Sequence, residues 1–124
     1  MIYLDTHIVV WLYQKDISKF TSEVIALIDR EELLISPMVE LELEYLFEIE
    51  RISERAEIII DYLKEKTGLK ICNSPFQDII KKAASSKWTR DPFDRIITAQ
   101  AAVNNSILIT KDKQIRKHYS KAVW

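Results

Sequence analysis

The amino-acid sequence predicts an α/β domain built around a parallel β-sheet. Short apolar stretches alternate along the chain with longer amphipathic segments, which is the pattern of strands connected by helices. Apolar residues make up 48% of the 124 residues, enough for a hydrophobic core, and no repeat or linker rich in Pro, Gly or Ser divides the chain. We therefore expect one domain that spans residues 1–124.

The expected strands are short and apolar, and most of the expected helices have a recognisable start or stop. The strands are four runs and a marginal fifth, at residues 2–4, 33–36, 69–72, 107–109 and 122–124. The helices lie near residues 6–13, 19–31, 53–66, 75–86 and 92–103, with a long one that opens at Ser36-Pro37 and a short one after Asp112. Gly68 supplies a C-terminal stop, and Asn104-Asn105 supply another by taking the left-handed position that glycine usually fills.

The scarcity of glycine, histidine and cysteine excludes several kinds of site. Gly68 is the only glycine, whereas a P-loop, a dinucleotide fingerprint and a nucleophile elbow each need more than one. Two histidines and one cysteine make a structural zinc site improbable. The single Cys72 excludes an internal disulfide and indicates a reducing compartment, so we expect a cytoplasmic protein.

No membrane association is expected from the sequence. No apolar run approaches the roughly 20 residues that cross a bilayer. The opening residues 1–5 also lack the basic and apolar segments of a secretory signal.

The net charge of −1 hides a strong asymmetry between the two halves of the chain. Residues 1–62 contain 5 Lys/Arg and 14 Asp/Glu, whereas residues 63–124 contain 13 Lys/Arg and 5 Asp/Glu. Two oppositely charged surfaces that help the halves pack would explain this pattern. An acidic metal pocket beside a basic rim that faces phosphates would explain it as well.

Four carboxylates are expected at one edge of the sheet. Asp5 directly follows the first strand, and Asp112 closely follows the fourth. Asp91 and Asp94 begin the helix that leads into that fourth strand, and such a helix runs antiparallel to its strands. Because open α/β sheets bind ligands beyond the carboxyl ends of their strands, we expect these acids to share a site.

Glu42 is expected to lie with these four carboxylates because of the helix face on which it falls. Residues three and four positions from Glu42 are apolar or mostly apolar, whereas Glu40, Glu44 and Glu48 form a stripe at spacing four that indicates the solvated side. A carboxylate on a buried helix face needs a cation or a hydrogen-bonding partner. Glu42 is therefore the candidate ligand among the glutamates of this helix.

Each acid has an ordinary structural explanation when taken alone. Asp5, Asp91 and Asp112 each precede a helix and suit an N-cap, and Asp94 suits a first helical turn. Their convergence changes the interpretation, because like charges gathered at one edge repel each other unless a cation lies among them. Ligands that are all carboxylates favour Mg²⁺ or Mn²⁺, which would activate a water to attack a phosphodiester. Thr6 and Thr110 are placed to hold such ligands or water by hydrogen bonds.

In order and spacing, four segments resemble the motifs of the PIN-domain nucleases, in particular the VapC-type toxins of bacterial and archaeal toxin–antitoxin pairs. The segments are Tyr3-Leu4-Asp5-Thr6-His7, Ile35-Ser36-Pro37 followed by Glu42, Arg90-Asp91-Pro92-Phe93-Asp94-Arg95 continuing to Ala99-Gln100-Ala101, and Leu108-Ile109-Thr110-Lys111-Asp112. Each motif is short, but the four in order extend over essentially the whole chain.

The resemblance implies a PIN-like fold, with a central parallel sheet of four to five strands and helices on both sides. It implies a Mg²⁺-dependent endoribonuclease in which Mn²⁺ can substitute, a VapB-type antitoxin that blocks the site, and a homodimer. Asp5, Glu42 and Asp94 match the central acids of the family, and Asp112 matches the fourth. Asp91 matches an extra acid of one VapC subgroup, whose role is the least defined.

Two other interpretations remain open at this stage. A Mg²⁺-dependent phosphatase would use Asp5 as an aspartyl nucleophile, although such enzymes want a second Asp close behind it and Thr6-His7 follow here. A binding module would keep the fold without catalysis. Arg95 is expected beside the acids, as a salt-bridge partner or a phosphate contact.

Three further residues near these motifs have ordinary explanations. His7 is expected to point away from the acids. Trp11 is expected in the core or in a dimer contact. Lys111 is expected either on a solvated helix face or along an RNA backbone.

Overall fold

The computed structural model describes residues 1–124 and contains a five-stranded, fully parallel sheet. The strands are β1 (Ile2–Leu4), β2 (Leu33–Ile35), β3 (Lys70–Ile71), β4 (Ile107–Ile109) and β5 (Ala122–Val123). Their order across the sheet is β3-β2-β1-β4-β5. The predicted parallel α/β architecture and the marginal fifth strand are thereby confirmed.

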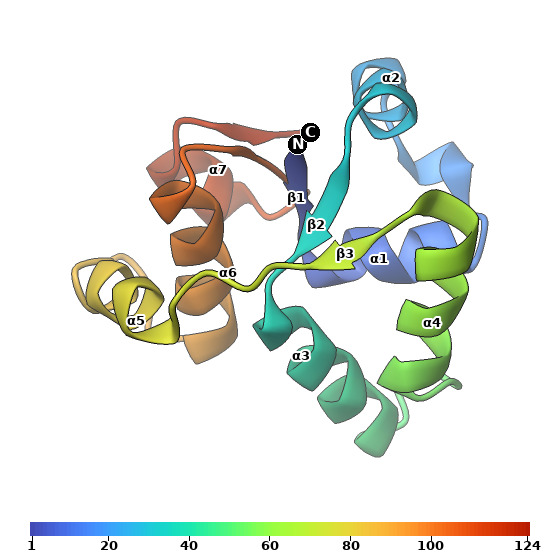
Figure 1. Cartoon of the computed structure of the whole chain (residues 1–124), viewed down its shortest axis with the longest axis horizontal. Helices are drawn as coiled ribbons and strands as arrows, with labels where there is room; N and C mark the ends of the chain where they lie inside the picture. The colour runs from blue at the N-terminus through green and yellow to red at the C-terminus, as the bar shows by residue number, and fades with distance from the viewer.

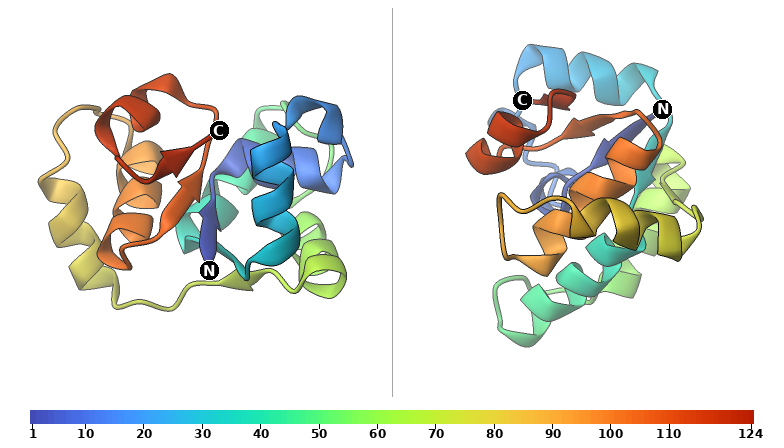
Figure 2. Two further views of the ribbon diagram at one scale, coloured as in Figure 1. Left: turned by 90° about the horizontal axis from the view of Figure 1, so that it is seen from above. Right: turned by 90° about the vertical axis from the view of Figure 1, so that its left-hand side faces the viewer.

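Seven α-helices and one 3₁₀ turn connect the strands. They are α1 (Thr6–Tyr13), η1 (Ile17–Lys19), α2 (Ser22–Arg30), α3 (Pro37–Glu48), α4 (Ala56–Thr67), α5 (Phe76–Ala84), α6 (Pro92–Val103) and α7 (Lys113–His118). Helices α5, α6 and α7 lie on one side of the sheet, and α1, α2 and α4 lie on the other (Figures 1 and 2). Helix α3 begins where β2 ends and contacts both α4 and α6.

The strand order places a topological switch point between β1 and β4. From β1 the chain adds β2 and then β3 on one side, and it returns to place β4 on the other side of β1. In the register of these two strands Leu4 pairs with Ile109, so both strands end at the same edge. The segments that follow, beginning at Asp5 and Thr110, therefore leave the sheet side by side, at the crevice where open α/β sheets bind ligands.

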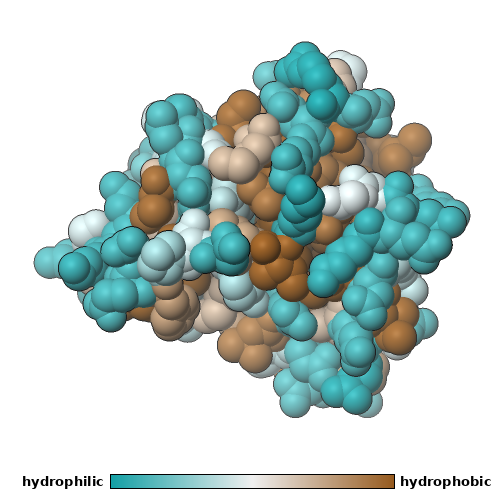
Figure 3. Space-filling model, in the orientation of Figure 1, coloured by the Kyte–Doolittle hydropathy of each residue, from teal (hydrophilic) through white to brown (hydrophobic).

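A main hydrophobic core contains 24 buried residues, drawn from β1, β2, β4 and most of the helices. A smaller cluster of Ile79, Ala83 and Ala99 packs α5 against α6. Hydrophilic side chains cover the outer helices on the face that Figure 3 shows, and hydrophobic ones gather near the centre of that view, around the strands. No helix combines the length and the apolar character that crossing a membrane requires.

Asp5 is the N-cap of α1, as its position before the helix predicts, because its side chain accepts a hydrogen bond from the Thr6 N–H. Two other helix starts differ from the sequence-based expectation. The helix expected over residues 19–31 begins only at Ser22, since η1 ends at Lys19 and Thr21 caps the start of α2 through the Val24 N–H. Helix α4 begins three residues later than expected.

The predicted stops after α4 and α6 involve left-handed residues, as expected. Gly68 ends α4 at a φ of +73°, a conformation that glycine adopts without steric cost. After α6 only Asn105 is left-handed, at a φ of +51°, whereas Asn104 keeps a φ of −92°. The amide of Asn104 instead donates to the Gln100 carbonyl oxygen, which satisfies a carbonyl of the last helical turn.

Candidate active site

A cavity of about 380 Å³ opens at the switch point, beyond the ends of β1 and β4. Five of its lining residues are the carboxylates Asp5, Glu42, Asp91, Asp94 and Asp112. Strands β1 and β4 position the first and the last of these, α3 positions Glu42, and the start of α6 positions the other two. The structure thus brings together every acid that the sequence singled out.

Asp5 is the most deeply buried of the five carboxylates, with 7% of its surface exposed. One carboxylate oxygen accepts from the Thr6 N–H at 2.8 Å, and the other accepts from the Thr110 hydroxyl at 2.6 Å. Burial raises the pKa of Asp5, the Asp112 charge raises it further, and the two hydrogen bonds and His7 oppose the increase. A buried carboxylate held in this way is poised to accept a cation.

Glu42 lies on the inward face of α3, as its helical phase predicts, and its carboxylate accepts a hydrogen bond from the Thr6 hydroxyl. Burial raises the pKa of Glu42 to about 7, and the charges of Asp5 and Asp91 add to the increase. Thr6 therefore orients Glu42 through its hydroxyl while it binds Asp5 through its N–H.

The other glutamates of α3 differ from Glu42 and from one another. Glu40 is exposed, as expected. Glu44 is more than a solvated residue, because it accepts hydrogen bonds from the Arg55 guanidinium and from the Ala56 N–H at the start of α4. These bonds lower the pKa of Glu44, so this carboxylate stabilises a helix junction away from the cavity.

Asp94 and Asp91 stand at the start of α6 and serve different structural purposes. The Asp91 carboxylate caps the helix by accepting from the Phe93 N–H at 2.8 Å and the Asp94 N–H at 3.3 Å. Burial raises the pKa of Asp94 to about 7, and the charges of Asp91, Asp5, Asp112 and Glu42 raise it further. Asp94 therefore lies within the electrostatic influence of all four other carboxylates.

Asp112 and Thr110 connect the end of β4 to this cluster. The Asp112 carboxylate caps α7 by accepting from the Ile115 N–H at 3.0 Å, and its own N–H donates to the Thr110 hydroxyl oxygen at 3.0 Å. Thr110 is fully buried, and its hydroxyl in turn donates a hydrogen bond to the Asp5 carboxylate. The expected hydrogen-bonding positions of Thr6 and Thr110 are thus both observed.

Three further side chains line the cavity, although the sequence did not predict that they would. His7, Trp11 and Lys111 complete the wall, so His7 does not point away from the acids as expected. The Lys111 ammonium lies 5.8 Å from the ring centres of both Trp11 and Trp124. Two signals were present: His7 and Trp11 are four positions apart on one helix face, and Lys111 directly precedes Asp112 at the end of the fourth strand.

Arg95 lies away from the carboxylates, contrary to expectation. Its guanidinium donates to the Ala83 carbonyl oxygen at 3.1 and 3.0 Å and to the Ala84 carbonyl oxygen at 3.2 Å. No ion pair joins it to the acids of the cavity. A cation at the C-terminal end of a helix satisfies free carbonyls, so Arg95 joins α5 to α6 rather than facing a phosphate.

The donor chemistry of the cavity fits a hard divalent cation. Oxygen ligands from carboxylates, with neither Cys nor His required, are typical of Mg²⁺ and Mn²⁺ sites. In this structure no three His, Cys, Asp or Glu side chains lie close enough together to hold one ion between them. Burial is the main cause of the raised pKa values of Glu42 and Asp94, and the charges of the neighbouring acids add to the increase, which a bound cation would offset.

Comparison with known proteins agrees with this geometry. The family model described as the PIN domain matches residues 2–121. The chain belongs to the PIN domain family. PIN domains are generally nucleases and usually depend on divalent metal ions. A search of curated proteins finds no match in sequence.

Solved structures of similar fold include toxin–antitoxin complexes. VapBC2 from Rickettsia felis, bound to a DNA fragment from its promoter, matches with a TM-score of 0.67 at 20% identity, over 99% of this PIN domain and 96% of the other chain. A toxin–antitoxin complex from Klebsiella pneumoniae matches with a TM-score of 0.70 at 20% identity, over 100% and 97%. VapBC-1 from nontypeable Haemophilus influenzae matches with a TM-score of 0.59 at 21% identity, over 100% and 96%. At these identities the likeness establishes the fold.

Proposed function

We propose that this PIN domain is a Mg²⁺-dependent endoribonuclease and the toxin of a VapBC-type toxin–antitoxin pair. One observation carries the proposal: five carboxylates from β1, α3, α6 and β4 line a single cavity at the switch point of the sheet. Maintaining so many like charges together is costly unless the site binds a cation. A bound divalent ion would supply a water of lowered pKa and stabilise the leaving oxygen of a phosphodiester.

Different residues of the chain have different roles in this proposed reaction. Asp5, Glu42 and Asp94 are the proposed central metal ligands, because they are the acids whose pKa values burial raises. Asp112 and Asp91 lie at the edge of the cluster, where each also caps a helix. Thr6 and Thr110 hold the Glu42 and Asp5 carboxylates in place. Lys111, on the wall of the cavity, supplies positive charge next to the path of a polyanion.

The decisive experiment measures RNA cleavage by the purified full chain. We expect cleavage in Mg²⁺, loss of cleavage on addition of EDTA, and loss of cleavage in the variants Asp5→Asn and Glu42→Gln. The matched control is Glu40→Gln, which removes an exposed carboxylate from the same helix and should retain activity. Equal cleavage by the wild type and by both site variants would overturn the proposal.

The same variants separate loss of chemistry from loss of folding. Each substitution removes one negative charge from a cluster of repelling carboxylates, so the metal-free variants should unfold at the same temperature as the wild type or a higher one. Circular dichroism melting curves measure this directly. A variant that neither cleaves RNA nor folds would be uninformative by itself, and Asp94→Asn then provides the second test.

The two alternative functions make different predictions for the same protein. In an aspartyl phosphatase Asp5 would attack phosphorus, yet both of its oxygens already accept hydrogen bonds here. Trapping a phosphoryl group on Asp5 would establish that chemistry. For a binding module without catalysis, Mn²⁺ titration should show no binding, or binding that Asp94→Asn leaves unchanged.

The proposed antitoxin partner is argued from the solved structures of similar fold. All three are described as VapBC or toxin–antitoxin assemblies, and each resembles this chain over nearly its whole length. A small DNA-binding protein encoded next to this chain is the expected partner. Co-expression should yield a complex that no longer cleaves RNA. Size-exclusion chromatography with light scattering tests the proposed homodimer in the same preparations.

A further inference from the structure

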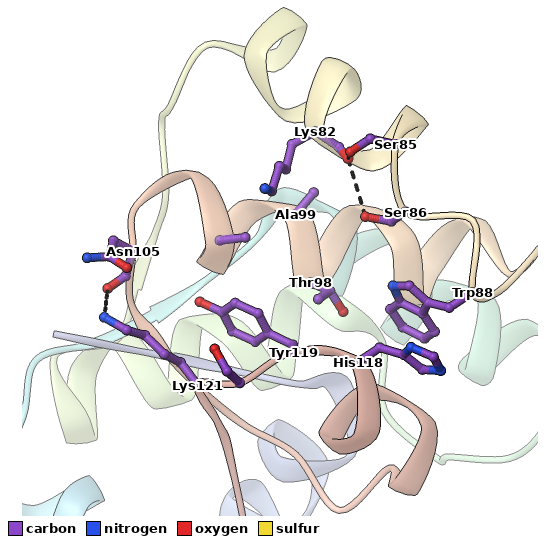
Figure 4. Close-up of a pocket in the computed structure, with 12 residues that line it drawn as sticks. Lys82, Ser85, Ser86, Trp88, Thr98, Ala99, Asn105, His118, Tyr119 and Lys121 are labelled. Carbon is purple, nitrogen blue, oxygen red and sulfur yellow. Dashed lines mark hydrogen bonds between the residues drawn. The ribbon is translucent and has the colours of Figure 1, made fainter.

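A second cavity, of about 500 Å³, lies between the end of α5, helix α6 and the segment from α7 to β5 (Figure 4). Its volume is in the range of small-molecule sites. None of its lining residues is acidic, which contrasts with the five carboxylates of the first cavity. The residues that define its chemistry are Lys82, Trp88, Thr98, His118, Tyr119 and Lys121.

Two lysines give this cavity a positive rim. Lys121 donates from its ammonium to the Asn105 carbonyl oxygen at 2.9 Å, which holds the charge at the edge of the cavity. Lys82 enters from the opposite side, from α5, and takes part in no salt bridge. Because neither ammonium group forms a salt bridge, both favour an anionic group such as a phosphate.

Aromatic rings form another part of the wall. The rings of Trp88 and His118 are stacked, with centres 5.2 Å apart and planes 8° from parallel. Figure 4 shows this pair at one end of the cavity, across from Lys121 and Asn105. An aromatic surface next to positive charge is the combination that binds single-stranded nucleic acid, because every base has a face that can stack.

The floor of the cavity contains a polar group without a partner. Thr98 is 4% exposed, and its hydroxyl is the one buried side-chain oxygen or nitrogen that makes no hydrogen bond. In Figure 4 this oxygen is turned toward the space between Trp88 and Tyr119. The Tyr119 hydroxyl is already engaged, since it donates to the Ser106 carbonyl oxygen at 2.5 Å. Buried polar groups are nearly always paired, so the Thr98 hydroxyl indicates a missing partner.

Helices α6 and α7 connect the two cavities. Asp94 lines the first cavity and Thr98 the second, and the two residues are one helical turn apart on one face of α6. Asp112 lines the first cavity and His118 the second, about 9 Å apart along α7 at 1.5 Å per residue. A strand that crosses the carboxylate site can therefore continue to the second cavity along the same two helices.

We infer that the second cavity binds one unpaired nucleotide of the RNA substrate, next to the scissile phosphodiester. Lys82 and Lys121 bind its phosphate, the Trp88–His118 pair stacks with its base, and the Thr98 hydroxyl forms a hydrogen bond with a polar edge of the base or the ribose. The substrate class rests on the proposed endoribonuclease function. The cavity itself is independent of the carboxylates, so the two can be tested separately.

The test measures binding of a short, fluorescently labelled single-stranded RNA by anisotropy, in EDTA so that no cleavage occurs. The double variant Lys82→Ala/Lys121→Ala should bind more weakly, and the slope of log affinity against log salt should fall by about 0.7 to 1.4, as expected for one or two lost phosphate contacts on a single strand. The matched control is Lys64→Ala/Lys66→Ala in the last turn of α4, which removes the same charge on the other side of the sheet. Equal affinity and slope in the cavity variant and in this control would overturn the inference.

A second variant tests the hydroxyl without changing charge. Thr98→Val removes only the unpaired oxygen, and it should weaken RNA binding while leaving the melting temperature unchanged or higher. Titration of 5′-AMP and of inorganic phosphate, followed by the indole NMR signal of Trp88, identifies the ligand chemistry. A shift with 5′-AMP that phosphate alone does not reproduce supports a nucleotide site. The same shift with phosphate alone overturns it in favour of an anion site.

The outcome is distinguishable from failure of the proposed nuclease function. If the wild type does not cleave RNA yet binds it through Lys82 and Lys121, the nucleotide site stands and the nuclease proposal fails. If the cavity variants bind RNA normally but lose the antitoxin, the cavity is a protein-docking site and the inference is overturned.

Discussion

The hydroxyl of Thr110 donates to a carboxylate oxygen of Asp5 at 2.6 Å, although the two residues are 105 positions apart in the chain. The same hydroxyl accepts from the Asp112 N–H at 3.0 Å. One buried side chain thus joins the end of β1 to the end of β4. It also fixes the direction of the most deeply buried carboxylate in the cavity.

Replacing Thr110 by valine should therefore reduce metal affinity without removing a ligand. Valine keeps the side-chain volume but leaves Asp5 without one of its two donors. Loss of a residue that orients a metal ligand typically costs about 10–100-fold in metal affinity or activity. Isothermal titration of Mn²⁺ measures the change. Thr67→Val is the matched control, because its hydroxyl binds only the Leu63 carbonyl oxygen on α4. Unchanged Mn²⁺ affinity in Thr110→Val would show that this hydroxyl plays no part in positioning Asp5.

The stability of the metal-free protein should fall as the pH rises toward neutrality. Burial and mutual repulsion raise the pKa values of Glu42 and Asp94 to about 7 in the folded state, whereas in the unfolded chain such groups titrate near pH 4. Between these values the folded state binds more protons than the unfolded state, so the free energy of unfolding decreases with pH over this window. We expect a melting temperature a few degrees higher near pH 5 than near pH 8.

The double variant Glu42→Gln/Asp94→Asn isolates this effect from other groups. Glu44 acts in the opposite direction, because Arg55 lowers its pKa and its contribution is lost as the pH falls. Subtracting the variant's melting profile removes such contributions, and the difference should lie between about pH 4 and pH 7. Mg²⁺ binds the ionised carboxylates, so it should raise the melting temperature of the wild type most at the alkaline end. An identical pH profile in the wild type and the double variant would contradict the raised pKa values.

The sheet could be predicted from the sequence because its strands are short apolar runs bounded by polar caps. The run Ile107–Ile109 is apolar throughout, and it forms a strand next to the centre of the sheet. The 3₁₀ turn η1 and the later start of α2 at Ser22 were not predicted. The apolar spacing of that segment is continuous, and the break depends on a local cap by Thr21 that competes with helix continuation.

The acids of the site could also be predicted from the sequence, but for a different reason than the sheet. A parallel sheet brings the residues that follow its strands to one edge, so Asp5 and Asp112 could be placed without coordinates. Arg95 could not, because its position next to Asp94 in the sequence indicates nothing about the direction of a long side chain. The free carbonyls at the end of α5, which only the packing of α5 against α6 brings next to Arg95, determine that direction. The second cavity was missed for a similar reason, since Trp88, Thr98 and His118 form no motif along the chain.

Arg95 should therefore contribute to stability rather than to catalysis. Its guanidinium makes three hydrogen bonds to carbonyl oxygens at the end of α5, and bonds from a charged donor contribute about 1.5–3 kcal/mol when partners are buried. The site is partly exposed, so we expect Arg95→Ala to lower the free energy of unfolding by about 1–2 kcal/mol in urea titrations. RNA cleavage by the folded fraction should be unchanged. If Arg95→Ala instead weakens RNA binding without changing stability, Arg95 contacts phosphate, as the sequence suggested.

Asp91 combines a helix cap with a negative charge, and two substitutions separate these contributions. Asparagine is as good an N-cap as aspartate, so Asp91→Asn should retain the bonds to the Phe93 and Asp94 N–H groups and the stability of α6. Asp91→Ala should destabilise the fold by about 1 kcal/mol through loss of the cap. Both remove a charge that raises the pKa values of Asp94 and Glu42, so both should lower the pH at which Mn²⁺ binding reaches half its maximum. If only the alanine variant changes Mn²⁺ binding, Asp91 acts on the site through the helix alone. If both abolish binding, Asp91 is itself a ligand.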